Sequence, residues 1–137
     1  MASLRVANRG AVAGSPRPMS EAAFQREVVR LARSLLWGVT IQSWRKTNEQ
    51  LEAYGQPPEP LAGLVFHPRF SVGSEPGWPD LVLIRRKDKR VLFRELKSDH
   101  GVVHPRQAAV LDLMTACGLD AAVWRPADLE RIGRELL

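Results

Sequence analysis

The sequence predicts a single α/β domain whose elements follow the order helix, three strands, helix, strand, helix. Three observations support this fold class. An apolar pattern of helical period lies near the N-terminus, two β-prone apolar runs flank a short charged turn, and a further helix and strand follow toward the C-terminus. The 137 residues have room for one hydrophobic core and not for a second full domain.

The first helix is predicted from Ser20 to about Leu36. Ser20 is a good N-cap, and Met19, which precedes the cap, can pack as a hydrophobic staple against Phe24, four residues after the cap. Apolar residues at helical spacing form the face expected to be buried: Phe24, Val28, Leu31, Ala32 and Leu35. Arginines fall largely outside that face: Arg26, Arg30 and Arg33. The helix is therefore expected to pack by one face and to present a basic face.

A short first strand is predicted at Val39 to Gln42, after Gly38 ends the helix. No clear period follows between Ser43 and about Trp78, and the prolines of segment 56–60 exclude a helix interior or a central strand. We therefore expect an insertion of irregular structure over about 43–76, in which Leu64 to Phe66 could add a short strand.

Two paired strands are predicted next. The aliphatic run Leu81 to Ile84 and the segment Val91 to Lys97 flank a polar turn centred on Lys87 and Asp88. With this turn, opposed residues have numbers that sum to 175, so Asp80 should face Glu95. The remaining elements are a helix that starts at Pro105 and ends before Gly118, a buried strand from Ala121 to Trp124 and an amphipathic C-terminal helix through Leu129, Ile132 and Leu136.

The composition favours a polyanionic partner such as nucleic acid, because 20 Lys and Arg outnumber 15 Asp and Glu. The first eighteen residues contain Arg5, Arg9 and Arg17 and no acid, which predicts a flexible basic tail over 1–18. The single cysteine, Cys117, excludes a disulfide within the chain and a thiolate zinc site. With no apolar run long enough for a bilayer and no signal-like leader, we expect a cytoplasmic protein without a membrane partner.

Asp80, Glu95 and Lys97 are the residues most suited to chemistry. Opposed Cβ atoms on antiparallel strands lie about 4.5 to 5.5 Å apart, so the two carboxylates can hold one divalent cation. Lys97 projects from the same strand face as Glu95 and can act beside them. The alternative is a strand-capping Asp80 with a surface salt bridge between Glu95 and Lys97. It is disfavoured because both share the side of Phe93 and Val91, where unpaired charges are costly to bury.

The segment Gly77-Trp78-Pro79-Asp80-Leu81, followed by Glu95-Leu96-Lys97, resembles the PD-(D/E)xK nuclease superfamily. More narrowly, it resembles the virus-type replication-repair nuclease domain, VRR-NUC. The match extends to the leading helix at Ser20 to Gln25, to Ser98 and to the segment His104 to Gln107, and it covers 20–42 and 77–126. The resemblance implies a restriction-endonuclease-like core with the order helix, three strands, helix, strand, built around a mixed sheet.

The resemblance also implies roles for individual residues. Asp80 and Glu95 would ligate Mg²⁺ or Mn²⁺ together with the main-chain carbonyl of Leu96, and Lys97 would assist the attacking water. Gln107 matches a polar position that faces the site, although a solvent-exposed helix glutamine is the alternative. Glu21 would complete the metal site, with Glu27 as a substitute, unless Glu21 is simply an exposed first-turn acid favoured by the helix dipole.

Within the insertion, basic residues are candidates for DNA backbone contacts: Arg45, Lys46 and Arg69. The insertion could instead serve an oligomer contact. His67 has two interpretations, a phosphate contact or an ordinary loop residue.

These observations predict a divalent-metal-dependent, structure-selective DNA endonuclease that acts on branched or flapped DNA in phage or bacterial replication, recombination or repair. One chain has one candidate site, so two coordinated cuts would require a homodimer. The competing hypothesis is a catalytically inactive DNA-binding or assembly module with the same fold. The intact set of Asp80, Glu95 and Lys97 argues against it.

Overall fold

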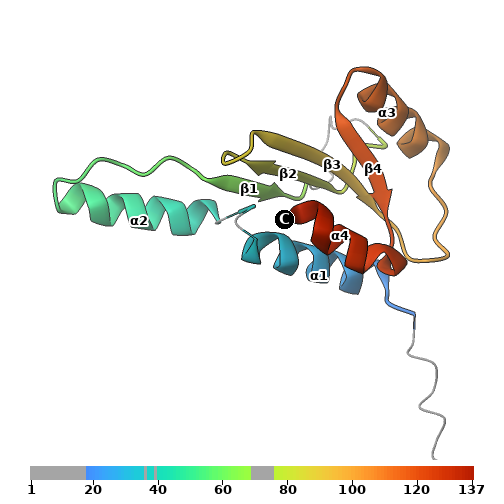
Figure 1. Cartoon of the computed structure of the whole chain (residues 1–137), viewed down its shortest axis with the longest axis horizontal. Coiled ribbons are helices and arrows are strands. Elements are labelled where there is room, and N and C mark those ends of the chain that lie inside the picture. Colours follow the sequence, from blue (N-terminus) through green and yellow to red (C-terminus); the bar gives the residue numbers. More distant parts are fainter. Residues whose placement is uncertain (1–17, 36, 39, 69–75) are drawn as a thin grey trace, which may run out of the picture.

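The computed structural model describes residues 18–35, 37–38, 40–68 and 76–137. The predicted basic tail, apart from Pro18, and the candidate DNA contact Arg69 lie outside the described residues. The elements are α1 (Glu21–Ser34), α2 (Ile41–Ala53), β1 (Gly63–Phe66), β2 (Leu81–Arg85), β3 (Arg90–Leu96), α3 (Pro105–Ala116), β4 (Asp120–Trp124), a 3₁₀ turn (Pro126–Asp128) and α4 (Leu129–Leu136), as Figure 1 shows. The predicted α/β class is confirmed.

The four strands form one mixed sheet in the order β1-β2-β3-β4. β1, β2 and β3 are antiparallel neighbours, whereas β4 runs parallel to β3 after the crossover through α3. Between β2 and β3, Leu81 pairs with Arg94 and Arg85 pairs with Arg90, which confirms the predicted register. The turn between these strands lies at 86–89, where the main-chain amide of Lys89 bonds the carbonyl of Arg86.

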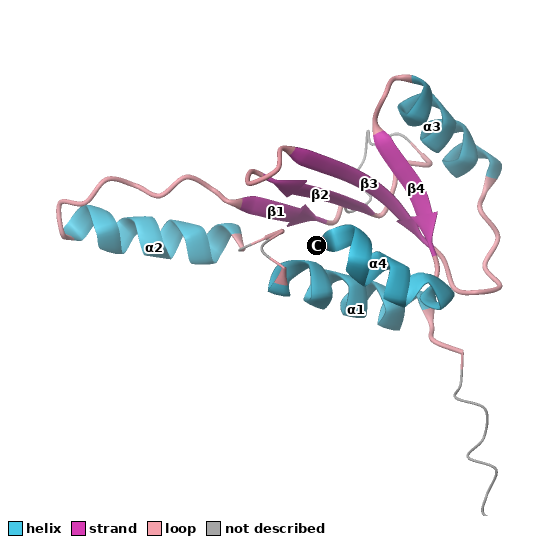
Figure 2. Ribbon diagram, in the orientation of Figure 1, coloured by secondary structure: helices cyan, strands magenta, loops and turns pink. Residues whose placement is uncertain are grey.

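The main core lies between the sheet and the helices α1 and α4, which cover one sheet face side by side (Figure 2). Alternate strand residues supply its sheet side: Leu81, Leu83, Leu92, Leu96 and Trp124. α3 packs against β4 and lies away from α1 and α4 in the same view. None of the helices in the described ranges is both long enough and apolar enough to cross a bilayer.

Arg85 connects three parts of this core. Its buried guanidinium donates hydrogen bonds to the carbonyls of Leu35 (3.2 Å) and Leu136 (2.8 Å), and it pairs with Asp88 in the hairpin turn at 2.7 Å. The same group lies 4.1 Å from the centroid of the Trp37 ring. The hairpin, the end of α1 and the end of α4 are therefore held by one fully partnered charge.

The predicted strand at Val39 to Gln42 is wrong. Val39 lies outside the described residues, but Thr40 caps α2 by accepting a hydrogen bond from the Ser43 amide at 3.0 Å, and Ile41 and Gln42 are helical. The predicted irregular insertion also contains the helix α2. The sequence shows no apolar stripe for this helix, because α2 buries none of its residues. The first strand is instead β1, at the segment considered only as a possible addition.

α2 and the segment 54–62 that returns from it form an arm, which extends away from the sheet in Figure 1. Local polar contacts hold the arm together. Trp44 Nε1 and the Asn48 side chain both contact the main chain of Glu59. The two ends of the arm lie close together, because a Cβ atom on Gly63 would stand only 2.5 Å from the carbonyl oxygen of Trp37.

Replacing residues 41–59 by a short Gly/Ser linker should change the free energy of unfolding by no more than about 1 kcal/mol, because no core contact is lost and a shorter loop is slightly easier to close. Urea denaturation measures this change. As a control, Leu83→Ala in the core should cost about 2–5 kcal/mol. A loss for the excision as large as that for Leu83→Ala would show that the arm is part of the folded core.

Candidate active site

The turn before β2 positions Asp80. Gly77 has φ +93°, and a Cβ atom there would lie 2.8 Å from the main chain of Arg106, so only glycine allows this close approach to the start of α3. Trp78 then packs edge-on against Phe93 with ring centroids 6.0 Å apart. Pro79 is buried. Asp80 thus enters the sheet from a turn that is anchored to both α3 and β3.

Asp80 contacts β3 directly, since its Oδ2 accepts a hydrogen bond from the main-chain amide of Leu96 at 2.8 Å. The N–H and C=O of one strand residue point to the same side of the strand, so the Leu96 carbonyl also faces the Asp80 side. The next residue alternates, because the Lys97 amide bonds the Trp124 carbonyl on β4 at 3.1 Å. The register therefore directs one carboxylate and one carbonyl to the same end of the sheet.

The Glu95 carboxylate is almost fully buried, with 1% of the residue exposed. Its Oε1 accepts a hydrogen bond from Gln107 Nε2 at 2.6 Å and lies 3.5 Å from Lys97 Nζ. Its Oε2 is buried and has no hydrogen-bond partner within the described part of the chain. Burial, together with the neighbouring Asp80 carboxylate, raises the pKa of Glu95 to about 7, and Lys97 acts in the opposite direction.

Gln107 links the start of α3 to the acid pair. Its Oε1 accepts a hydrogen bond from the His104 amide at 2.9 Å, and this contact leaves the amide nitrogen directed at Glu95. His104 caps the helix by accepting from the Arg106 amide through Nδ1 at 3.2 Å. The role of His104 was missed from the sequence. The signal for it was the spacing of a capping box, in which a polar cap precedes Gln at the third helical position.

The structure does not bring the other predicted ligands to this pair. Glu21 is exposed in the first turn of α1, and Glu27 is ion-paired with Arg30. Among the described residues, no third His, Cys, Asp or Glu side chain joins two others in a group that could hold a metal ion. Arg45 and Lys46 lie exposed on the arm, with Arg45 3.6 Å from Glu49.

The residues that do converge fit a hard divalent cation. Mg²⁺ is commonly held by one or two carboxylates, and substrate phosphate and water complete its oxygen ligands. Asp80 and Glu95 provide two carboxylates, and the unsatisfied Oε2 of Glu95 is a buried oxygen that a cation would satisfy. Two acids that can hold a divalent cation, with the Lys97 amine beside them, can chemically support metal-assisted hydrolysis.

The chain belongs to the VRR-NUC domain family, whose model matches residues 24–128. This membership makes the protein a nuclease domain with DNA as its substrate, and it confirms the family resemblance of the Asp80 and Glu95 segments. No curated protein and no solved structure matches the chain.

In the metal-free protein, Glu95→Gln should increase the free energy of unfolding at alkaline pH. Folding raises the pKa of Glu95 from 4.5 to about 7, so wild-type stability falls as pH rises through this range. The variant cannot ionise here. Its advantage should approach about 3 kcal/mol above pH 7 and vanish below pH 4.5. Denaturation in the presence of a chelator measures this difference, and a difference that does not change with pH would contradict the raised pKa of Glu95.

Proposed function

We propose that the chain is a Mg²⁺- or Mn²⁺-dependent endonuclease that hydrolyses DNA phosphodiester bonds at the Asp80 and Glu95 pair. One observation carries this proposal. Glu95 is a buried carboxylate beside a second acid, and its Oε2 has no partner in the described chain. Leaving a buried polar atom unsatisfied is costly, so such a group calls for a functional explanation.

The proposed metal ligands are the carboxylates of Asp80 and Glu95 and the carbonyl of Leu96. A divalent cation bound there supplies positive charge that polarises the scissile phosphate and makes a nearby water more acidic. The hydrogen bond from the Leu96 amide to Asp80 Oδ2 holds that carboxylate in place and leaves its other oxygen for the cation. Gln107, on α3, likewise holds the Glu95 carboxylate in place by donating a hydrogen bond to its Oε1.

Lys97 is the proposed catalytic amine. Its side chain is 13% exposed, and the ammonium lies 3.5 Å from Glu95 Oε1, so a substrate phosphate at the acid pair would stand within its reach. There it can orient the attacking water and offset the negative charge that develops on the phosphorus centre. Its contact with Glu95 keeps the flexible side chain in the site before substrate arrives.

For the substrate we propose branched or flapped DNA, cut by a homodimer. A branched molecule presents two strands to cut, whereas each chain contributes one acid pair, so a symmetric dimer is the simplest way to make paired cuts. A panel of branched, flapped and linear DNAs tests the selectivity, and light scattering tests the assembly. Equal rates on all substrates, or a monomeric mass with full activity, would overturn these parts of the proposal.

Asp80→Ala, Glu95→Ala and Lys97→Ala should each reduce metal-dependent cleavage by at least about 100-fold, because each removes a charge that the transition state requires. The first two should also weaken Mg²⁺ binding in a calorimetric titration, whereas Lys97→Ala should largely spare it. These measurements separate the metal ligands from the amine.

Asp112→Ala and Lys87→Ala are matched controls. Asp112 is an exposed acid on α3, and Lys87 is an exposed amine in the β2–β3 turn. Both controls should cleave at wild-type rates. If any of the three site variants also cleaved at wild-type rates, that residue would leave the proposed site. A wild-type protein that binds DNA without cutting it in Mg²⁺ or Mn²⁺ would favour the inactive module.

Gln107→Ala should raise the metal concentration needed for half-maximal cleavage by about 10- to 100-fold, because groups that orient a metal ligand contribute on this scale. A titration of cleavage against Mg²⁺ measures the shift. Gln107→Glu tests the donor specifically, since a carboxylate placed against Glu95 cannot donate the same hydrogen bond when ionised. An unchanged metal requirement in both variants would reduce Gln107 to a helix-capping residue.

A further inference from the structure

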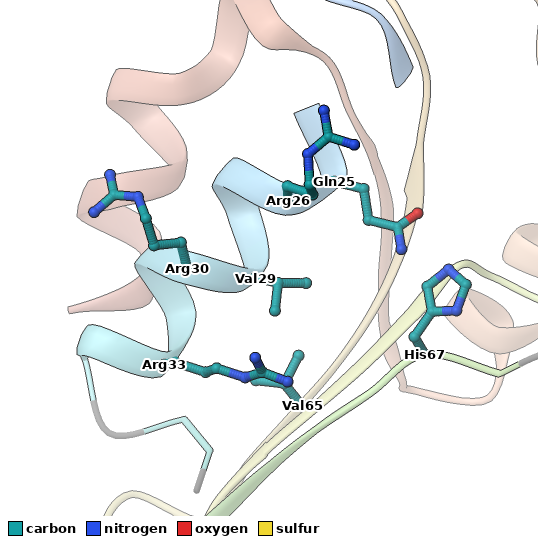
Figure 3. Close-up of a pocket in the computed structure, with 7 residues that line it drawn as sticks. All are labelled: Gln25, Arg26, Val29, Arg30, Arg33, Val65 and His67. Atoms are coloured by element: carbon teal, nitrogen blue, oxygen red, sulfur yellow. The ribbon is translucent and has the colours of Figure 1, made fainter. Parts of the chain in front are cut away.

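A basic groove, separate from the acid pair, runs between α1 and β1 (Figure 3). Its volume is about 730 Å³. Val29 and Val65 form an apolar strip inside it, Arg33 extends toward Val65, and Gln25 points toward His67. Arg26 and Arg30 complete the side that α1 contributes. We refer to this feature as the α1 groove.

The arginines of the α1 groove are spaced along one side of the helix. Arg26, Arg30 and Arg33 are separated by four and three residues, a spacing that keeps their side chains on neighbouring turns. From Arg26 to Arg33 the helix rises by about 10 Å, at about 1.5 Å for each residue. The row is therefore long enough for its two ends to reach separate phosphates of one strand, because these follow at about 3.4 Å along the axis of duplex DNA.

Two of these arginines are available for an anion. Arg26 and Arg33 are exposed and form no ion pair with any residue that the structure describes. Arg30 differs because it forms an ion pair with Glu27, which neutralises its charge. The hydrogen bond from Arg30 lowers the pKa of the Glu27 carboxyl. The attraction for phosphate should therefore be concentrated at the two ends of the row, Arg26 and Arg33.

The α1 groove lies toward the catalytic end of the sheet. Phe66 pairs with Val82, so His67 stands one residue further toward the end at which Asp80 precedes β2. β1 is separated from β3 by β2, a distance of about 10 Å for two strand spacings. Asp80 and Glu95 lie at this same end of the sheet but on its opposite face, beside α3, so a duplex that contacts both sites would pass around the end of the sheet.

We propose that the α1 groove binds the phosphate backbone of duplex DNA, through Arg26 and Arg33, beside the strand that is cut. Among the described residues that line the groove there is no Phe, Tyr or Trp, whereas surfaces for unpaired strands commonly use such rings to stack bases. Phosphate contacts of this kind hold a duplex independently of its sequence. The choice of DNA as the ligand rests on the proposed function of the acid pair.

The test compares two double variants that each remove two positive charges from a chain of net charge +5. Arg26→Ala/Arg33→Ala changes the α1 groove, and Lys87→Gln/Lys89→Asn changes the β2–β3 turn. Asn suits Lys89 because that residue has φ 55°. Both arginines are exposed on a helix where alanine is well tolerated, and thermal melts verify that each variant folds.

Binding is measured by fluorescence anisotropy with a short blunt-ended duplex, with Ca²⁺ in place of Mg²⁺ to prevent cutting. Between about 50 and 200 mM salt, the slope of log affinity against log salt should become shallower by about two for the groove variant, because two phosphate contacts are lost. The turn variant should keep the wild-type slope. Equal slopes in the two variants, or a loss confined to an unpaired oligonucleotide, would overturn the proposal.

Cleavage by the wild-type protein in Mg²⁺ separates this proposal from the proposed function. If the wild-type protein cuts DNA while the groove variant keeps the wild-type slope, the proposal that the α1 groove binds DNA is wrong and the nuclease proposal stands. If the wild-type protein does not cut DNA while the groove variant shows the shallower slope, the proposal that the α1 groove binds DNA stands and the nuclease proposal is wrong.

Discussion

The antiparallel register of β2 and β3 is the constraint on which the candidate centre depends. Because residue numbers across this pair sum to 175, Asp80 meets the end of β3 and its carboxylate accepts the Leu96 amide at 2.8 Å. A slip by one residue would turn Glu95 and Lys97 toward the core formed with α1 and α4. That slip is opposed on the core face, by the apolar residues of the core and by Arg85 at the far end of the pair.

Much of this arrangement could be predicted because it is encoded locally. The run from Leu81 to Ile84 and the polar turn at Lys87 and Asp88 set the strand pairing without information from elsewhere in the chain. Glu95 and Lys97 lie two residues apart on one strand, so their contact also follows from strand geometry. The family match across 24–128 then supports the nuclease class that these residues indicated.

The parts that could not be predicted depend on contacts between distant segments or on surfaces without a pattern. α2 buries no residue, so its sequence has no periodic apolar stripe. Thr40 to Gln42 are β-prone, and for this reason the N-cap role of Thr40 was not recognised. Glu21 matched a helix position, but sequence position alone does not determine how far α1 brings it toward the sheet. The α1 groove likewise exists only because β1, which follows the arm, returns beside α1.

The link from His104 through Gln107 makes the position of Glu95, a proposed metal ligand, dependent on the integrity of one helical turn. α3 buries only Leu111 and Met114, and both lie beyond its first turn. Helix ends open locally at free energies well below that of global unfolding. Such fraying would release the Glu95 carboxylate while the sheet and its core stayed folded. Under the proposed function, heat would therefore inactivate the protein before it melts, and the interval between the two temperatures would report the local stability of that turn.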